Sequence, residues 1–454
     1  MRLITIVLTL FISYTSSARG IYVKESAAGV SDGTSWDNAF TLLNVALDSA
    51  SYEDSVFVAA GRYLPEHKFN VPSGVRVFGG LDGSTFPVNL DVLNQRNFDH
   101  NVSMVTADVL NDDYKFENDD DNYGDLFYLQ NTDSSTVIDG FLISGGNKRT
   151  WYGGAGVYMT QADGEIRNCI FRWNQTETNG GALSVFGGNV VLENLIFDHN
   201  KSAVSFDFST VVAKNILLIN NLESIWGNEV LSINNSDVTL INATIAGNET
   251  VEDLHAVEIF SNKNPGSAIS FTNVLIANNS SSFNEEANLN IVENGFINFT
   301  VDHSLIIGSG GSDNWMLEGA TDLGGNLDSD PRLVNPDTGD VRLFSGSPGL
   351  GAGDQIQGIH IGYFQGADSP VAVGEVNEAV YASAYPNPVS AQLIIESEYI
   401  IEIIQVINQQ GVIVDEITPM KTTYNLNVAG YEYGLYVTKL KTKDGSAVIH
   451  FLVE

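Results

Sequence analysis

The chain is poor in basic residues and in cysteine. Its 454 residues include 21 Lys and Arg against 56 Asp and Glu, which gives a formal net charge of -35. A surface this acidic repels phosphate backbones and anionic headgroups, which argues against nucleic-acid or membrane-surface binding through a basic patch. The lone Cys169 excludes an intramolecular disulfide and a cysteine-rich zinc site.

The chain also lacks a long apolar segment beyond its first residues. No later segment reaches about 18 uninterrupted apolar residues, so we predict no transmembrane segment in the mature chain. Yet 43% of the residues are hydrophobic and only 17% are charged, which is the composition of a folded protein and not of a solvated acidic tail. The length indicates either several units or one long repetitive unit.

The first residues have the pattern of a secretory signal peptide. Met1 and Arg2 precede an apolar run over residues 3–12, and small residues follow up to Ala18. The run is too short to span a bilayer. We therefore expect residues 1–18 to direct export to the periplasm and to be removed before Arg19.

The middle of the chain is repetitive. Five segments share one asparagine, at Asn168, Asn194, Asn215, Asn242 and Asn273. Each segment has a second asparagine six residues later, at Asn174, Asn200, Asn221, Asn248 and Asn279. Asp139 and His303 hold the first position in degenerate outer copies, and successive copies are 21 to 31 residues apart. Short strands at this period, without helical periodicity, predict the coils of a parallel β-helix.

The recurring asparagines have a structural explanation. Asparagine tolerates the left-handed backbone that a coil corner needs, and stacked amides can hydrogen-bond from coil to coil. We therefore interpret both asparagine columns as part of the corners of the solenoid.

Several stretches resemble a known family. IYVKESAAGVSDGTSWDNAFTLLNVAL from Ile21, GVRVFGG from Gly74 and VIDGFLISGGN from Val137 resemble secreted right-handed parallel β-helix proteins of the pectate-lyase-like superfamily. DPRLVNPDTGDVRLFSGSPGLGAGD from Asp330 is similar to the closing segment of its choice-of-anchor Q type. The resemblance implies a right-handed parallel β-helix over residues 19–366. It leaves activity open, because members with this pattern mostly lack an assigned reaction.

The C-terminal part is a separate unit. After a linker-like stretch at residues 367–380, YPNP begins at Tyr385, short alternating strands follow, and GLY stands at residues 434–436. These landmarks resemble the C-terminal sorting domain of the type IX secretion system of the Bacteroidota. The resemblance implies that residues 381–454 form a small immunoglobulin-like β-sandwich that the secretion machinery recognises. An ordinary carbohydrate-binding or immunoglobulin-like module is the alternative.

Side-chain alternation in the repeated strands predicts a groove on the outside of the solenoid. Its two outward columns are Tyr158, Ser184, Ser205, Ser232, Glu258 and Asn290, and Thr160, Phe186, Asp207, Asn234, Phe260 and Val292. Tyr158, Phe186 and Phe260 are candidate sugar-stacking residues beside hydroxyl groups. Asp207 and Glu258, two coils apart, are a candidate carboxylate pair of a glycoside hydrolase. The alternative is an ordinary solvated face.

A second set of candidates lies at the other asparagine track. The repeat places Arg172 beside Asp198 and Trp173 beside His199 on the next coil. A lyase needs a base and a cation that stabilises the resulting enolate, roles that Arg172 and His199, with Lys201, could fill. A stacked ion pair with an aromatic contact is the alternative. Lys148 and its basic and aromatic neighbours at residues 149–152 form another candidate edge for an anionic sugar.

The densest acidic stretch runs from Asp108 to Asp125. Asp112, Asp113, Asp119 and Asp121 are candidate Ca²⁺ ligands, since Ca²⁺ takes six to eight oxygens from a flexible loop. The spacing is not that of an EF-hand, and a shared structural loop is the alternative.

The sequence thus predicts an all-β protein on the outer cell surface or secreted from it. We expect the solenoid to contact extracellular polysaccharide as a binding, adhesive or structural surface. The alternative is a polysaccharide lyase or glycoside hydrolase that acts in the groove.

Overall fold

The computed structural model describes residues 18–453 apart from the gaps that follow. These are 111–115, 117–121, 123, 149–152, 179, 223–228, 251–254, 263–265, 282–287, 293–296, 337–338, 345, 355–359, 364–381, 386–388, 408–412, 432 and 443–444. Contacts divide the chain into two compact units, Met1–Val371 and Ala372–Glu454.

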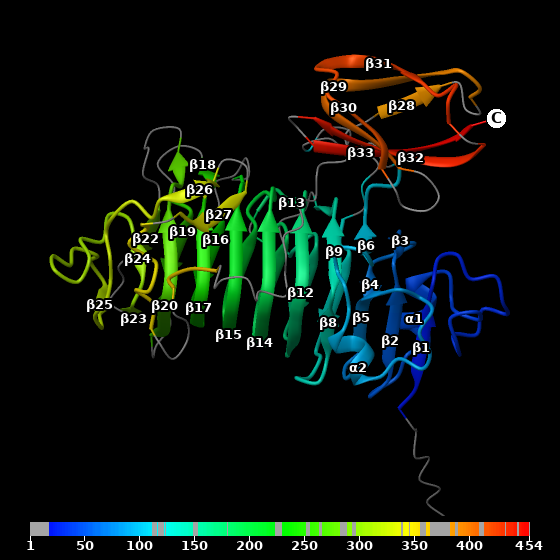
Figure 1. The fold of residues 1–454 in the computed structure, drawn as a ribbon. Helices are drawn as coiled ribbons and strands as arrows, with labels where there is room; N and C mark the ends of the chain where they lie inside the picture. Colours follow the sequence, from blue (N-terminus) through cyan, green and yellow to red (C-terminus); the bar gives the residue numbers. More distant parts are fainter. Residues whose placement is uncertain are drawn as a thin grey trace, which may run out of the picture. The chain divides into compact units, whose positions relative to one another are not determined.

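The larger unit is a parallel β-helix with three strand faces, as predicted. The first face contains β4 (Phe69–Asn70), β7 (Phe127–Gln130), β11 (Val157–Thr160), β16 (Leu231–Asn234), β19 (Val257–Phe260) and β22 (Leu289–Val292). The second contains β1 (Gly20–Val23), β2 (Ser55–Ala59), β5 (Arg76–Leu81), β8 (Val137–Asp139), β23 (Ile297–Asp302) and β25 (Ala320–Asp322). The third contains β3 (Gly61–Tyr63), β6 (Ser103–Thr106), β9 (Phe141–Ser144) and β24 (Leu305–Ile306). Figure 1 shows these strands stacked in chain order.

Five long strands bend around the corners between the faces. They are β12 (Gly164–Arg172), β14 (Leu183–Asp198), β15 (Val204–Ile219), β17 (Asp237–Ala246) and β20 (Ser267–Ala277). Strands β14 and β15 extend over all three faces, and they pair in parallel from Leu183 with Val204 to Asp198 with Ile219. Short parallel pairs lie beside the faces: β10 (Asn147–Lys148) with β13 (Gln175–Thr176), and β18 (Glu249–Thr250) with β21 (Ser280–Ser281).

Inward side chains of all coils form one continuous apolar core. It includes stacked phenylalanines such as Phe171 and Phe197, whose ring centroids are 4.7 Å apart. Helix α1 (Leu43–Ser49) packs Leu43, Ala46 and Leu47 into the same core at the N-terminal coils. A short helix, α2 (Leu90–Asn94), precedes Arg96, which pairs with Asp139 on β8 at 2.9 Å.

The first asparagine column forms a hydrogen-bonded ladder. Asn168 Nδ2 donates to Asp139 Oδ1 at 2.8 Å. Each later amide donates to the preceding member at 2.9 to 3.3 Å, in the order Asn194, Asn215, Asn242 and Asn273. All five asparagines have φ between 52° and 56°, so the predicted left-handed corner is confirmed for this column.

The second asparagine column forms a ladder of opposite direction. Its amides donate toward the next coil at 2.8 to 3.0 Å, from Asn174 through Asn200, Asn221, Asn248 and Asn279 to Asn288. These asparagines do not have the left-handed backbone that we predicted for them. The preceding residue has it instead, at Trp173, His199, Asn220, Gly247 and Asn278. The asparagine itself turns inward, where its amide replaces the backbone partners lost at the corner.

The closing segment of the unit returns along the third face. It includes the antiparallel pair β26 (Leu333–Asn335) and β27 (Asp340–Leu343). Val341, Ile361 and Tyr363 pack on outward apolar residues of the coils, including Leu217 and Leu275. Burial of these side chains explains why the third face carries leucine and isoleucine on its outside.

The smaller unit is an antiparallel β-sandwich. Its strands are β28 (Ala382–Tyr385), β29 (Gln392–Ile407), β30 (Ile413–Ile417), β31 (Lys421–Asn427), β32 (Gly434–Thr442) and β33 (Gly445–Val453). The long β29 pairs with β28, β30, β31 and β32. Leu393, Ile404, Leu440 and Phe451 belong to its separate apolar core. The predicted fold class is therefore confirmed for both units.

Candidate functional site

The strand register brings together the two predicted columns of the groove on the first face. Tyr158 pairs with Ser184, Ser184 with Ser205, and the same column continues through Ser232 and Glu258 to Asn290. The second column aligns Thr160, Phe186, Asp207, Asn234, Phe260 and Val292 in the same pairs. We call the outer surface of these columns the strand groove.

The middle of the strand groove is less open than the alternation suggests. Ser184, Ser205 and Ser232 are 5%, 0% and 6% exposed. The turn at Gly180 approaches Ser184 closely, and the Ser205 hydroxyl donates to Asp207. The hydroxyls expected to meet a sugar are therefore buried. Tyr158, Glu258 and Phe260 are partly exposed.

An exposed aromatic pair lies where the first face turns into the second. Phe186 is 41% exposed and Phe208 is 57% exposed, and their ring centroids are 5.8 Å apart at 67°. Phe208 has φ 52°, and the equivalent corner residues are Gln161, Gly187 and Asn235, which also have positive φ. A bulky residue in this conformation costs about 1–2 kcal/mol. Phe208 is thus strained and at the same time presents an apolar ring to solvent.

Sequence reasoning missed Phe208 because the residue lies at a corner, outside the alternating strand pattern. The sequence nevertheless contained a signal that could have identified this position. Phe208 aligns with Gly187 and Asn235, two residue types that suit a left-handed backbone, and an aromatic residue in that column is out of place.

Asp207 lies beside the aromatic pair and is mostly shielded from solvent. Burial raises the pKa of its carboxyl group, although Ser205 and Asn234 donate hydrogen bonds to the carboxylate and lower it. The Ser205 hydroxyl is 2.5 Å from Asp207 Oδ2. A carboxyl group of raised pKa can act as a proton donor closer to neutral pH than an ordinary aspartate.

Glu258 is not well placed as the partner of Asp207. Its carboxylate accepts a hydrogen bond from Asn290 Nδ2 at 3.3 Å. The two acids lie two coils apart and in different columns, because Glu258 pairs with Ser232 whereas Asp207 pairs with Asn234. Strand spacing and rise then separate their backbones by about 12 Å. Inverting glycosidases hold their carboxyl groups about 6.5–9.5 Å apart.

At the N-terminal end of the strand groove, two tyrosines carry cations over their rings. Tyr128 and Tyr158 have ring centroids 5.7 Å apart. Lys68 Nζ lies 3.4 Å from the centre of the Tyr128 ring, and Lys148 Nζ lies 4.9 Å from that of Tyr158. Lys148 also pairs with Asp125 at 2.7 Å. The basic cluster predicted around Lys148 therefore lies beside Tyr158, while residues 149–152 lie outside the described residues.

The lyase candidates at the second track are engaged with one another. Arg172 and His199 both contact the carboxylate of Asp198, at 2.5 and 2.6 Å. Burial raises the pKa of Asp198, but His199 and Arg172 outweigh it and hold the pKa at about 2. The Trp173 and His199 rings are in tilted contact with centroids 4.5 Å apart, and Trp173 meets Phe116 edge-on at 5.2 Å. This is the stacked ion pair and aromatic contact that the sequence offered as the alternative.

The four candidate Ca²⁺ ligands, Asp112, Asp113, Asp119 and Asp121, lie outside the described residues. Among the residues that the structure describes, no group of three or more His, Cys, Asp or Glu side chains could hold a metal ion. In the same part of the chain, no helix is long and apolar enough to cross a membrane.

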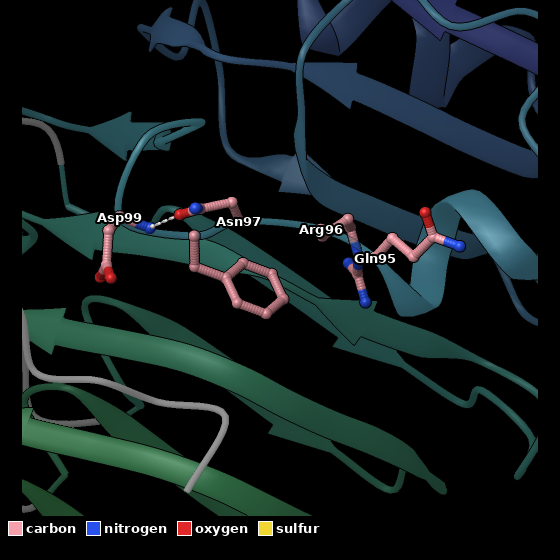
Figure 2. Close-up of a pocket in the computed structure, with 5 residues that line it drawn as sticks. Gln95, Arg96, Asn97 and Asp99 are labelled. Atoms are coloured by element: carbon pink, nitrogen blue, oxygen red, sulfur yellow. Dashed lines mark hydrogen bonds between the residues drawn. The ribbon is translucent and has the colours of Figure 1, made fainter. Parts of the chain in front are cut away.

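A polar hollow lies away from the strand groove, after α2. Gln95, Arg96, Asn97, Phe98 and Asp99 line it (Figure 2). Arg96 is already engaged by the carboxylate of Asp139, through two hydrogen bonds of 2.9 Å, and by the carbonyl of Gly79 at 3.0 Å. The hollow is therefore the outer side of a contact that holds the α2 segment on the coils.

Comparison with known proteins identifies the smaller unit. Residues 383–454 match the family of the secretion system C-terminal sorting domain. This is the type IX sorting tail that the sequence predicted. The chain is therefore a parallel β-helix protein with a type IX sorting tail, and it is secreted or carried to the cell surface.

No curated protein matches the chain, and the solved structures similar to it share little sequence with it. Pectate lyase Pel9A is 12% identical with a TM-score of 0.41, over 77% of this chain and 97% of that one. The enzymatically active domain of tailspike protein 2 of bacteriophage CBA120 is 10% identical with a TM-score of 0.26, over 97% and 71%. With TM-scores below 0.5, neither likeness bears on the activity of this chain.

Proposed function

We propose that the solenoid binds extracellular polysaccharide as an adhesive or structural surface, without turnover. The observation that carries this proposal is the exposed pair Phe186 and Phe208 at the edge of the strand groove. Aromatic rings in this setting stack on the C–H faces of sugars. A secreted or surface protein meets such polymers outside the cell.

The geometry supports binding over turnover. The Arg172 guanidinium and the His199 ring both contact the buried carboxylate of Asp198, so both groups are already engaged within the protein. Asp207 and Glu258 lie two coils apart and in different columns of the strand groove, which disfavours a water-mediated pair. The first set lies on adjacent coils but is engaged internally with Asp198, and the second set lies two coils apart.

One observation favours the alternative of a glycoside hydrolase. Asp207 has a raised pKa and lies next to Phe186, so it could donate a proton to a sugar that stacks on the ring. No comparable observation favours a polysaccharide lyase.

Export is part of the same proposal. Residues 1–18 act as a signal peptide, residues 19–366 form the exported solenoid, residues 367–380 act as a linker, and residues 381–454 are recognised by the type IX machinery. Ca²⁺ binding by Asp112, Asp113, Asp119 and Asp121 remains a second, separate proposal.

The test combines binding and turnover on one panel. Purified full-length protein is incubated with plant, algal and host polysaccharides, with and without Ca²⁺. Affinity electrophoresis measures binding, while chain length and the absorbance of unsaturated products measure turnover. We expect retardation on at least one polymer, no chain shortening, and at least a tenfold loss of affinity in Phe186→Ser.

The matched control is Phe344→Ser, because Phe344 is 58% exposed on the closing segment and not in the strand groove. Chain shortening that Asp207→Asn abolishes would establish the hydrolase alternative. Absence of retardation on every polymer, or equal losses in Phe186→Ser and Phe344→Ser, would refute the binding proposal.

A further inference from the structure

Four large exposed apolar side chains lie together on two neighbouring coils. Phe186 and Val191 on β14 are 41% and 45% exposed, and Phe208 and Val212 on β15 are 57% and 43% exposed. Val191 pairs with Val212 in the strand register, and the two phenylalanine rings are in contact. Exposed apolar side chains that occur in such pairs on neighbouring coils mark an interaction site more often than isolated exposed residues do.

This surface runs around the coil, not along the solenoid axis. Phe186 and Phe208 lie at the edge of the first face, whereas Val191 and Val212 lie on the second face of the same two coils. Between them, Asn189 pairs with Thr210, and both are exposed. We call Phe186, Asn189, Val191, Phe208, Thr210 and Val212 the corner patch.

The polar members of the corner patch are already oriented. Asp163 Oδ1 accepts hydrogen bonds from the backbone N–H of Asn189 at 2.7 Å and from its Nδ2 at 3.0 Å. The patch therefore presents aromatic rings, a held amide, a hydroxyl and two branched aliphatic groups in sequence. Apolar surface with a few placed polar groups is the usual composition of a ligand site.

The strained backbone of Phe208 is an independent sign of function. The same corner takes glycine or asparagine on the neighbouring coils, at Gly187 and Asn235, which adopt positive φ easily. Stability alone would favour such a residue over an exposed phenylalanine. Backbone strain of this kind clusters at binding sites.

Charge decides the class of ligand. The groups bordering the corner patch are five acids and two bases: Asp163, Glu165, Glu193, Asp207 and Asp237, with Arg167 and Lys214. The whole chain carries a net charge of -35. The acidic groups repel an anionic polymer, whereas they do not repel a neutral sugar chain.

We propose that a neutral polysaccharide chain lies across the corner patch. The polysaccharide follows the direction of strands β14 and β15 and therefore runs transverse to the solenoid axis. This inference rests on the proposed function and deepens it, since it names the ligand class and the direction of the chain.

The test is affinity electrophoresis of the full-length protein in gels that contain hydroxyethyl cellulose, galactomannan, arabinoxylan or soluble starch as neutral polymers. Polygalacturonate and alginate serve as anionic polymers. The patch variants are Phe208→Asn, which suits the left-handed backbone, and the double variant Val191→Thr with Val212→Thr, which keeps branched strand formers. The controls are Phe344→Ser and Val334→Thr on the closing segment, where both side chains are exposed. Tyr158→Ser and Phe260→Thr test whether the polymer lies along the strand groove instead.

We expect retardation on a neutral polymer, at least a tenfold loss in both patch variants, and less than a twofold change in the controls. Phe208→Asn should melt at or above the temperature of the wild type, which separates lost binding from lost folding. Binding that depends on Tyr158 and Phe260 but not on Val191 and Val212 would overturn the transverse direction and leave the proposed function intact.

Three other outcomes would also contradict the inference. Retardation only on the anionic polymers would overturn the ligand class, while retardation on none would remove the proposed function itself. If the patch variants instead abolish self-association in sedimentation velocity and leave polysaccharide binding unchanged, the corner patch is an interface between copies of the chain, and the inference is wrong.

Discussion

At the scale of single residues, the corners of the solenoid separate structural positions from functional ones. Asn168 and its equivalents adopt a left-handed backbone and use their amides in a ladder, so conformation and hydrogen bonding agree. Phe208 adopts the same left-handed conformation, but its side chain has no group that could join such a hydrogen-bonded ladder. Folding alone does not explain a phenylalanine at this corner, which makes Phe208 a candidate ligand-binding residue.

Asp198 offers a residue-scale prediction for the pH dependence of stability. Its folded pKa of about 2 lies below the unfolded value of 3.8. The stabilisation is therefore fully present at neutral pH, declines as the pH falls below about 4, and is lost as the pH passes through about 2. We expect Asp198→Asn to lower the free energy of unfolding by about 2 kcal/mol at pH 7 and by roughly half as much at pH 3.

Urea unfolding from pH 7 to pH 3 measures this effect. Asp302→Asn is the matched control, because Asp302 also contacts a histidine, His303 at 2.8 Å, but its side chain is 27% exposed. The control should change stability by less than about 0.5 kcal/mol. A pH-independent cost of Asp198→Asn would contradict the low pKa.

At the scale of the elements, two amide ladders of opposite direction join the coils. The first donates toward the N-terminal coils and ends on Asp139, whose carboxylate also binds Arg96 and Arg167. The second donates toward the C-terminal coils and ends on Asn288. Each ladder thus ends on an acceptor, which leaves its last buried donor paired.

The middle of the second ladder provides an element-scale prediction. Asn221 is fully buried, accepts from the Asn200 amide, and donates to Asn248 Oδ1 and to the Phe197 carbonyl. Asn221→Ala leaves several buried polar groups without partners, so we expect a loss of about 3 kcal/mol or more in urea unfolding. The exposed Asn298→Ala should stay within about 0.5 kcal/mol. Equal effects in the two variants would show that the ladder contributes little.

The period of the sequence predicted the strand register of the coils closely. Tyr158, Phe186, Asp207, Glu258 and Phe260 all occupy the predicted columns, because one residue of slip would move each side chain to the opposite face. Alternation did not predict burial. Ser205 lies in an outward column yet is fully buried, because exposure depends on neighbouring parts of the chain as well as on the strand itself.

At the scale of the whole molecule, the sorting tail and the solenoid form separate compact units with separate cores. This division fits a cargo joined to a sorting tail. The acidic charge of the chain acts at this scale too, since it sets the long-range repulsion of anionic polymers.

Deletion of residues 381–454 gives the prediction at this scale. We expect the truncated protein to remain in the periplasm, because the match to the sorting domain covers residues 383–454. Cell fractionation and surface proteolysis measure its location, and a full-length chain with the destabilising change Asn221→Ala controls for effects of folding. Normal surface delivery of the truncated chain would contradict recognition through this tail.

The repeat, the strand register, the left-handed corners of the first asparagine column and the sorting tail could all be predicted from the sequence, because each depends on local backbone preference and on spacing along the chain. Only the tertiary structure decided which outward residues meet solvent. The closing segment covers the third face, Asp198 contacts both Arg172 and His199, and Phe208 meets Phe186 on the neighbouring coil. These outcomes depend on contacts between residues distant in the chain, and a repeat pattern does not predict such contacts.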